Sequence, residues 1–152
     1  MLTRYSDSDL SADVIGRRST GGMAFYLNDS LISWCSQKQK TVALSSCESE
    51  FMAATSAARQ ALWLRNLLSE IIGSMQKVVT LYVDNNSAIA LMKNLVFHGR
   101  SKHVDIKYHF IWECVESGQI VVCRVYTDVQ KAVKLATMRH LMGVRDLSSH
   151  QD

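Results

Sequence analysis

The sequence lacks the patterns that mark several classes of protein. It contains no proline among its 152 residues, whereas globular proteins contain about 5%, and it has no internal repeat and no low-complexity linker. No apolar run approaches the ~20 residues that cross a membrane, and the first nine residues are polar and acidic. We therefore expect a soluble protein without a secretory signal, in the cytoplasm or the nucleus.

The four cysteines form neither a zinc-binding nor a redox pattern. No two of them are spaced as Cys-x-x-Cys, and none stands at a zinc-like spacing from a histidine. Each lies in an apolar-looking segment, so we expect four buried thiols in a reducing compartment. They are Cys35, Cys47, Cys114 and Cys123.

Length and charge limit the architecture more than the function. A chain of 152 residues, 47% of them hydrophobic, can form one domain with a substantial core but is too short for two ordinary domains. The formal net charge of +3 permits a polyanionic partner such as nucleic acid without requiring one.

A buried strand that ends in a carboxylate is the centre of the predicted fold. Five of the six residues from Val78 to Val83 are β-branched or aromatic, which favours a strand. Asp84 follows, and Asn85 to Ser87 can cap a helix that continues from Ala88. Sites in open α/β sheets collect beyond the carboxyl ends of strands, so Asp84 is a candidate site residue. The alternative is a turn aspartate that only helps to cap the helix.

A long helix is predicted to begin at Ser45. The run from Ser45 to Glu48 has the Ser-x-x-Glu spacing of a capping box, and Gly73 is expected to end the helix. Residues at alternating three- and four-residue steps form a stripe that faces the core. This stripe contains Ala54, Ala57, Ala61, Leu64, Leu68 and Ile71.

Glu50 lies at the head of this stripe, four residues before Ala54. Glu48 is about 200° away around the helix at ~100° per residue and is expected to serve the cap, while Arg59 is expected to face solvent. Acidic residues seldom occupy a core-facing stripe unless they are paired or bind a metal. Glu50 is therefore a second candidate site residue.

The first part of the chain predicts an antiparallel meander. A short first strand is expected from Leu2 to Ser6 and leads into Asp7. Strands usually have ~5 to 6 residues, and the chain begins almost on this one, so we expect the residues that normally start such a strand to be missing. Arg17 to Gly22 is expected to be a turn-rich connection. The remaining expected segments are strands at Met23 to Leu27 and Leu31 to Trp34, and a polar loop from Gln37 to Lys40.

The last part contains a basic segment, a strand and a helix. Basic and aromatic residues interleave from His98 to Ile111, which suits contact with a phosphate backbone, although composition alone favours an ordinary amphipathic helix. A fifth strand is expected from Ile120 to Val125, followed by a helix that Thr127 or Asp128 caps. From about Arg139 the chain is polar, and its end is expected to be partly disordered.

Three carboxylates on separate elements define the expected chemistry. Asp7 ends the first strand, Glu50 heads the long helix and Asp84 ends the fourth strand. Such oxygen ligands suit a hard cation, Mg²⁺ with Mn²⁺ as an alternative. Two such ions ~4 Å apart can activate a water and stabilise the leaving oxygen of a phosphodiester displacement. A serine hydrolase or a zinc enzyme has no support.

Six stretches carry a family resemblance: residues 5–9 (YSDSD), 18–22 (RSTGG), 32–34 (ISW), 37–51 (QKQKTVALSSCESEF), 83–89 (VDNNSAI) and 97–106 (FHGRSKHVDI). With them the chain resembles the ribonuclease H domain of copia-type LTR retrotransposon polyproteins, most closely the copies abundant in plant genomes. Together they place the resemblance over most of residues 1 to about 130. Motifs of this length, in this order, are highly specific.

The resemblance implies a fold and an activity. The fold is ribonuclease H-like, an α/β fold with a five-stranded mixed sheet and helices on both faces, expected to cover residues 1–137 with a divergent, partly disordered tail at 138–152. The activity is Mg²⁺-dependent hydrolysis of RNA in an RNA/DNA hybrid. The catalytic and metal-binding acids of the family fall on Asp7, Glu50 and Asp84.

The resemblance also gives the basic segment an expected partner. By composition alone the segment is an ordinary helix, whereas in a ribonuclease H it is expected to contact the hybrid. The residues expected to do so are Arg100, Lys102, His103 and Lys107.

One departure from the family bears on catalysis. The last family helix usually carries a fourth acid in a Pro-Thr-Glu-x-Gln-x-Ala-Asp pattern, and the matching run here, residues 126–133, ends in Val133. A lost ligand weakens retention of the second ion, and valine cannot orient a metal-bound water. We expect weakened hydrolysis. The alternative is a catalytically inactive, retrotransposon-derived module that binds nucleic acid or protein.

Overall fold

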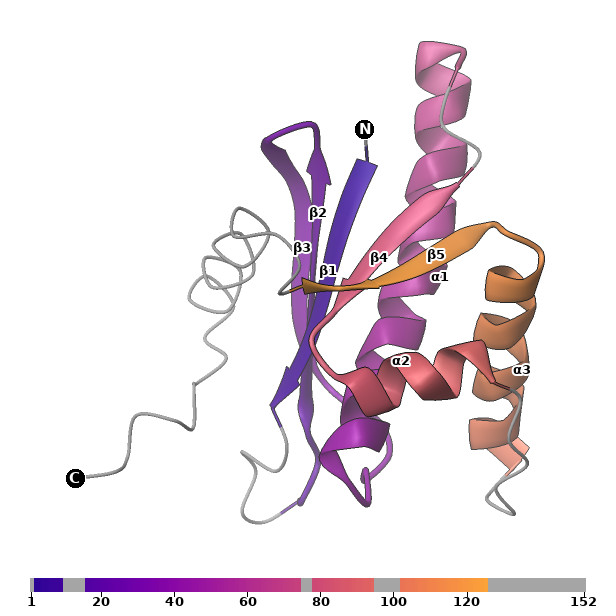
Figure 1. Cartoon of the computed structure of the whole chain (residues 1–152). Helices are drawn as coiled ribbons and strands as arrows, with labels where there is room; N and C mark the ends of the chain where they lie inside the picture. The colour runs from indigo at the N-terminus through magenta and orange to yellow at the C-terminus, as the bar shows by residue number, and fades with distance from the viewer. Residues whose placement is uncertain (1, 10–15, 75–77, 95–101, 126–152) are drawn as a thin grey trace.

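Five strands and three helices make up the described part of the chain, which comprises residues 2–9, 16–74, 78–94 and 102–125 of the computed structural model (Figure 1). In chain order the elements are β1 (Leu2–Asp9), β2 (Thr20–Leu27), β3 (Ser30–Lys38), α1 (Ser46–Ile72), β4 (Val79–Val83), α2 (Asn86–Lys93), α3 (Lys102–Glu116) and β5 (Ile120–Arg124). The predicted last helix, Val133 and the tail of residues 138–152 lie outside the described residues.

β1 and β4 form the centre of a mixed sheet whose strand order is β3-β2-β1-β4-β5. β2 is antiparallel to both β1 and β3, whereas β4 is parallel to β1 and β5 is parallel to β4. Parallel neighbours need long crossovers, and these contain α1 before β4 and the α2–α3 pair before β5. The carboxyl ends of the three parallel strands therefore point the same way (Figure 1).

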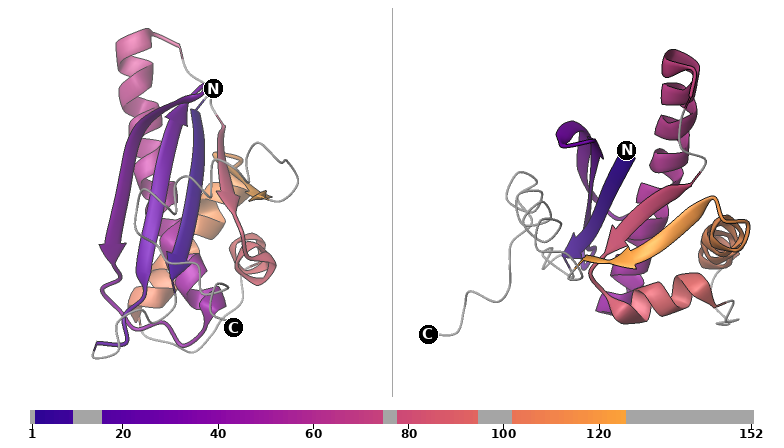
Figure 2. Two further views of the ribbon diagram at one scale, coloured as in Figure 1. Left: turned by 90° about the vertical axis from the view of Figure 1, so that its left-hand side faces the viewer. Right: turned by 45° about the horizontal axis from the view of Figure 1, so that its top comes forward.

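The described helices pack on one face of the sheet, where the main core lies (Figure 2). Alternate residues of a strand face the same side, and on β4 these are Val79, Leu81 and Val83. The ring of Phe51 on α1 stacks on that of Tyr108 on α3, with centroids 4.1 Å apart. Small alanines fill the rest of the α1 face, so the helix backbone lies close to the strands.

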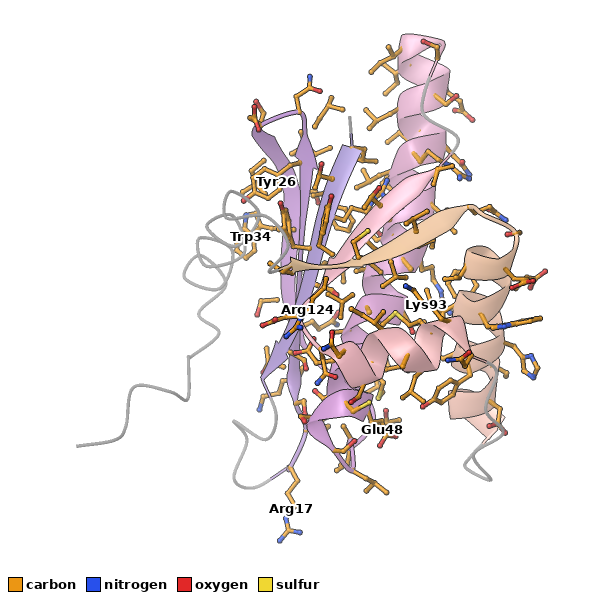
Figure 3. The ribbon with its side chains drawn as sticks, viewed as in Figure 1. Arg17, Tyr26, Trp34, Glu48, Lys93 and Arg124 are labelled. Atoms are coloured by element: carbon orange, nitrogen blue, oxygen red, sulfur yellow. The ribbon has the colours of Figure 1, made fainter. Side chains whose placement is uncertain are left out.

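The opposite face of the sheet carries a second buried cluster, rich in tyrosine. The ring of Tyr5 stacks on Tyr82 at 5.3 Å and meets Tyr26 edge-on at 5.8 Å. Figure 3 shows Tyr26 and Trp34 on the side of the sheet away from α1. Helices were expected on both faces, but the last predicted helix lies outside the described residues.

Three strands are longer than the sequence predicted. β2 begins at Thr20, so the predicted turn through Gly22 is wrong, and β3 extends to Lys38, so part of the predicted polar loop is wrong. β1 has eight residues instead of a short strand that stops at Ser6. The cause is pairing, because Thr20 lies between Asp9 and Lys38 in the ladder. Ladder hydrogen bonds hold these polar residues in strands that side-chain periodicity does not reveal.

α1 has the predicted ends but not the whole predicted stripe. The Ser45 side chain accepts the N–H of Glu48 at 3.1 Å, and Gly73 ends the helix with a φ of 80° that glycine adopts without strain. The first four residues of the stripe are buried. Ile71 is 71% exposed, so its prediction is wrong, because α1 extends beyond the sheet there (Figure 1).

The structure can be compared with the predictions about the cysteines and about membrane-spanning segments. Cys114 is buried, but Cys35, Cys47 and Cys123 are only half-buried, so the prediction of four buried thiols is wrong for those three. All four thiols are free. Among the described helices, none combines the length and the apolar character needed to span a membrane.

Candidate active site

Asp7 and Asp84 occupy neighbouring positions on the two central strands. Tyr5 of β1 pairs with Tyr82 of the parallel strand β4. Asp7 is two residues beyond Tyr5, and Asp84 is two residues beyond Tyr82, directly after β4. Paired strands lie ~4.8 Å apart, so the same register continued for two residues beyond the pairing of Tyr5 with Tyr82 would bring the two backbone positions side by side. The side chain of Asp7 is outside the described part of the chain.

Glu50 reaches the same position from the first turns of α1. It is 7% exposed, and its Oε1 accepts the backbone N–H of Ser8 at 3.1 Å. The hydroxyl of Ser49 donates to Ser8 Oγ at 2.8 Å. These contacts fix the start of α1 against β1 at the residue that follows Asp7, so Glu50 lies beside the backbone position of Asp7.

Asn85, rather than Asp84, caps α2. Its Oδ1 accepts the N–H of Ala88 at 3.0 Å, and its backbone is extended as a cap residue requires. The capping role that was the alternative for Asp84 is therefore filled by its neighbour. Asp84 itself is half-buried at the carboxyl end of β4.

Glu48 serves the start of α1, as predicted from its position on the helix. Its Oε2 accepts the N–H of Leu44 at 2.8 Å, while its own N–H donates to Ser45 Oγ. Burial, and then the carboxylates of Glu48 and Glu50, raise the pKa of the Cys47 thiol. Cys47 therefore ionises less readily than a free cysteine, which weakens it as a nucleophile.

The donor set suits a divalent cation that prefers oxygen. Carboxylates from separate elements are the usual protein ligands of Mg²⁺. Among the side chains that the structure describes, which do not include that of Asp7, no group of three His, Cys, Asp or Glu residues forms a metal cluster. The fit to a metal therefore depends on the chemistry of the three acids and on their converging backbone positions.

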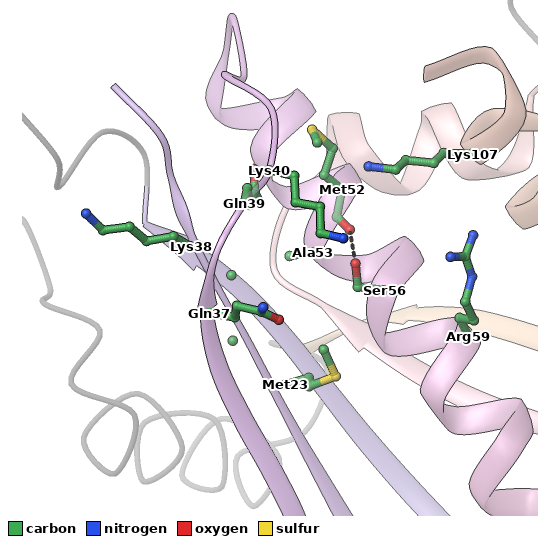
Figure 4. Close-up of a pocket in the computed structure, with 12 residues that line it drawn as sticks. Met23, Gln37, Lys38, Gln39, Lys40, Met52, Ala53, Ser56, Arg59 and Lys107 are labelled. Atoms are coloured by element: carbon green, nitrogen blue, oxygen red, sulfur yellow. Dashed lines mark hydrogen bonds between the residues drawn. The ribbon is translucent and has the colours of Figure 1, made fainter. Parts of the chain in front are cut away.

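The predicted nucleic-acid contacts are described only in part. Arg100 is outside the described residues, and Lys102 and His103 lie in the first turn of α3 with side chains that are not described. Lys107 is half-buried and lines a cavity of about 290 Å³ beside α1 (Figure 4). The cavity also contains Arg59, which is exposed as predicted.

Sequence reasoning missed the residues that hold Glu50 in place. Besides Ser8 and Ser49, the amide of Gln39 contributes, since its Nε2 donates to the carbonyl of Ser49 at 2.9 Å. No periodicity marks these residues. The sequence marks the two serines only as neighbours of predicted acids, since Ser8 follows Asp7 and Ser49 precedes Glu50.

The fold is that of ribonuclease H. The structure of LC11-RNase H1 isolated from compost superposes with a TM-score of 0.61, covering 92% of this chain and 91% of that one at 13% identity. LC11-RNase H1 in complex with an RNA/DNA hybrid gives a TM-score of 0.56, covering 82% and 85% at 11% identity. This confirms the predicted α/β class and the predicted fold.

The sequence comparisons give the family. No protein-family model matches the chain, but the retrovirus-related Pol polyprotein from transposon TNT 1-94 of Nicotiana tabacum is 39% identical over 132 residues, 87% of this chain. The Pol polyprotein from transposon RE1 of Arabidopsis thaliana is 40% identical over 131 residues, 86% of this chain. The chain spans about a tenth of each relative's length. It is a homologue of one segment of plant retrotransposon Pol polyproteins, which confirms the predicted resemblance to such polyproteins.

Proposed function

We propose that this chain hydrolyses RNA in RNA/DNA hybrids, using divalent metal ions held by Asp7, Glu50 and Asp84. The observation that carries the proposal is the meeting of β1, α1 and β4, where Glu50 accepts the N–H of Ser8 and Asp84 continues the register of Asp7. The ribonuclease H fold supports the reaction class, and the hybrid bound by LC11-RNase H1 supports the substrate class. Mg²⁺ is the proposed metal, with Mn²⁺ as an alternative.

The residues of the site have separate tasks in this proposal. Asp7, Glu50 and Asp84 hold the cations, and bound Mg²⁺ supplies an activated water and charge stabilisation for the leaving oxygen. The N–H of Ser8 fixes the position of Glu50 Oε1. The Ser49 to Ser8 hydrogen bond keeps the start of α1 against β1. Carboxylates held in place before the substrate arrives need little reorganisation during the reaction.

Cleavage of a labelled RNA/DNA hybrid with Mg²⁺ or Mn²⁺ tests the site. Asp84→Asn and Glu50→Gln should each lower the rate on the order of 100-fold or more, because each removes a charged ligand. Glu70→Gln is the matched control on the same helix, where Glu70 is exposed, and should cut at the native rate. Equal cleavage by the native chain and Asp84→Asn would refute this assignment of the site.

We further propose that Val133 weakens the reaction, since the family's fourth acid is missing there. Restoring it with Val133→Asp should raise the rate, because a fourth carboxylate helps to retain the second ion. If the native chain and Val133→Asp are folded and bind a hybrid but neither cuts it, the alternative holds, and the chain is an inactive module that acts by binding.

A further inference from the structure

Among the described strands, β3 has the longest open edge. In the described part of the chain it pairs with β2 alone and forms the outer strand of the sheet, while β5 forms the other edge (Figure 2). β3 has nine residues, whereas β5 has five. An open edge presents a row of backbone N–H and C=O groups that can pair with another strand. The edge of β3 is therefore the better template for a further strand.

This edge lacks the features that usually prevent strands from pairing. Natural edge strands are protected by short length, by charged side chains or by proline. From Ser30 to Gln37, β3 contains neither a proline nor a charged residue. Its ladder with β2 is continuous from Ser33 to Lys38, so this stretch keeps the regular strand geometry that a further strand needs.

Exposed apolar side chains lie along the same edge. Leu31, Ile32 and Trp34 are 37%, 41% and 55% exposed. Leu31 pairs with Tyr26 and Trp34 pairs with Ala24, and directly paired residues face the same side of a sheet. Leu31 and Trp34 therefore lie on the face of the tyrosine-rich cluster, to which Tyr26 and Ala24 belong. Tryptophan is enriched among the residues that carry binding energy at protein interfaces.

The charges at the two ends of the strand favour a second copy of this chain as the partner. Asp29 directly precedes β3 and Lys38 ends it, and both residues are exposed. When two copies of the strand pair antiparallel, Lys38 of each copy comes next to Asp29 of the other. A parallel pair would instead place each charge beside its own kind, which is unfavourable. The strand is therefore complementary to itself in the antiparallel direction, which is the arrangement that a two-fold axis produces.

We propose that two copies of this chain form a two-fold symmetric dimer in which their β3 strands pair antiparallel, centred near Trp34, and join the two five-stranded sheets into one. Trp34 is the middle residue of β3, so the two indoles meet on one face of the joined sheet. One strand from each copy makes a small interface, so we expect a dissociation constant on the order of 10 to 100 µM.

The dimer does not depend on the proposed function. β3 runs in the same direction as β1, because each is antiparallel to β2. The carboxyl end of β1, where the candidate acids lie, is therefore at the same end of the sheet as the carboxyl end of β3. Antiparallel pairing of the β3 strands places the two candidate sites at opposite ends of the joined sheet.

Sedimentation velocity of the full chain, from well below to well above the expected dissociation constant, tests the dimer. Trp34→Lys and Trp34→Glu should each raise the dissociation constant roughly tenfold or more, because each removes the indole contact and places like charges together near the axis. An equimolar mixture of the two variants should dimerise again, because opposite charges then meet there. The matched control is Val121→Lys, at a side chain that is 45% exposed on the other edge strand, and it should dimerise as the native chain does.

A charge exchange at the ends of β3 gives a second test. Lys38→Asp should weaken the dimer several-fold, because it brings acidic residues together, and adding Asp29→Lys to the same chain should restore it. Amide hydrogen exchange should show that protection of β3 increases with protein concentration while that of β5 does not. Circular dichroism of each variant at low concentration should match the native spectrum, because these side chains are exposed.

A native chain that stays monomeric over the whole range would overturn the proposal, and so would a dimer that both Trp34 variants leave intact. Loss of the dimer in each variant and its return in the mixture would support it. If the native chain stays monomeric but binds a synthetic peptide of residues 29–38, the edge accepts a strand but a second copy is not its occupant. If an RNA/DNA hybrid protects the β3 amides of a monomeric chain, the edge contacts nucleic acid instead. Either of these results would also overturn the proposal.

Discussion

The two halves of α1 are both rich in apolar residues but have different surroundings. In the first half, Phe51, Ala54 and Ala57 are completely buried against the sheet. In the second half, Trp63 is 56% and Ile71 is 71% exposed, and the end of the helix extends past the strands (Figure 1). Both halves are apolar, so contact with the sheet, rather than hydrophobicity, decides which side chains are buried.

The half of α1 that packs on the sheet therefore carries both the contacts that stabilise the fold and the candidate site. Glu50 and the Ser56 wall of the cavity beside α1 belong to the half that packs on the sheet. The buried residues of α1 end at Leu64, so the rest of the helix contributes few buried contacts. Substitutions along α1 should therefore have large effects at side chains that are buried against the sheet, the last of which is Leu64, and small effects at exposed side chains. Three of the four predictions below test this division, and the fourth concerns Arg4 on β1.

The largest effect is expected at Phe51. Phe51→Ala removes a fully buried ring that stacks on Tyr108 and should lower the free energy of unfolding by ~3 to 5 kcal/mol. Trp63→Ala is the matched aromatic control at an exposed position of the same helix and should cost well under half as much. Urea unfolding followed by circular dichroism measures both, and equal losses would contradict the division.

A gain is expected at Arg4, on β1 beneath α1. Arg4 is 1% exposed, its Nη1 donates a long hydrogen bond of 3.5 Å to the Thr80 carbonyl, and its buried Nε has no hydrogen-bond partner among the residues that the structure describes. Burial, and then the charge of Arg65, lower the pKa of Arg4 to about 9. Arg4→Met should therefore raise the free energy of unfolding at neutral pH by ~1 to 4 kcal/mol, because it removes a buried charge.

The pH dependence of that gain has a definite sign. Above a pH of about 9, folded Arg4 loses its proton while the unfolded chain keeps it, so the unfolded state binds more protons and native stability rises with pH. Below that pH the cost of the buried charge is complete and constant. The advantage of Arg4→Met should shrink by up to ~1.4 kcal/mol per pH unit above it. If Arg4→Met stays more stable than the native chain by the same amount as the pH rises above about 9, the buried charge of Arg4 is not the cause of the gain.

A smaller loss is expected at the start of the buried half. Ser45→Ala removes the hydroxyl that accepts the Glu48 N–H and should cost ~1 kcal/mol. Ser45→Asp restores an acceptor and should recover most of the loss. Thermal unfolding of the three proteins compares them, and an unchanged midpoint for Ser45→Ala would show that the cap contributes nothing.

The smallest effect is expected at the exposed end. Ile71→Ser changes a side chain that is 71% exposed and should alter the free energy of unfolding by no more than ~0.5 kcal/mol. The measurement is the same urea titration as for Phe51→Ala. A loss comparable to that of Phe51→Ala would mean that this end of α1 is packed in solution.

Local chemistry made the helix ends and the candidate acids predictable. The cap at Ser45, the end at Gly73 and the burial of Glu50 follow from spacing within a few residues. The extent of β2 and β3 does not, because Thr20 and Lys38 are strand residues only through their pairing with each other. The cavity beside α1 was equally hidden, since its residues Lys40, Arg59 and Lys107 meet only after α1 and α3 pack.

The parallel pairing of β1 with β4 determines when the site can form during synthesis. Asp7 and Glu50 precede the strand that carries Asp84, so a ribosome must add 77 residues after Asp7 before the third acid exists. At 5 to 20 residues per second this takes ~4 to 15 s. Throughout that interval the nascent chain carries an incomplete set of acids, so the proposed site cannot be assembled before β4 has been made.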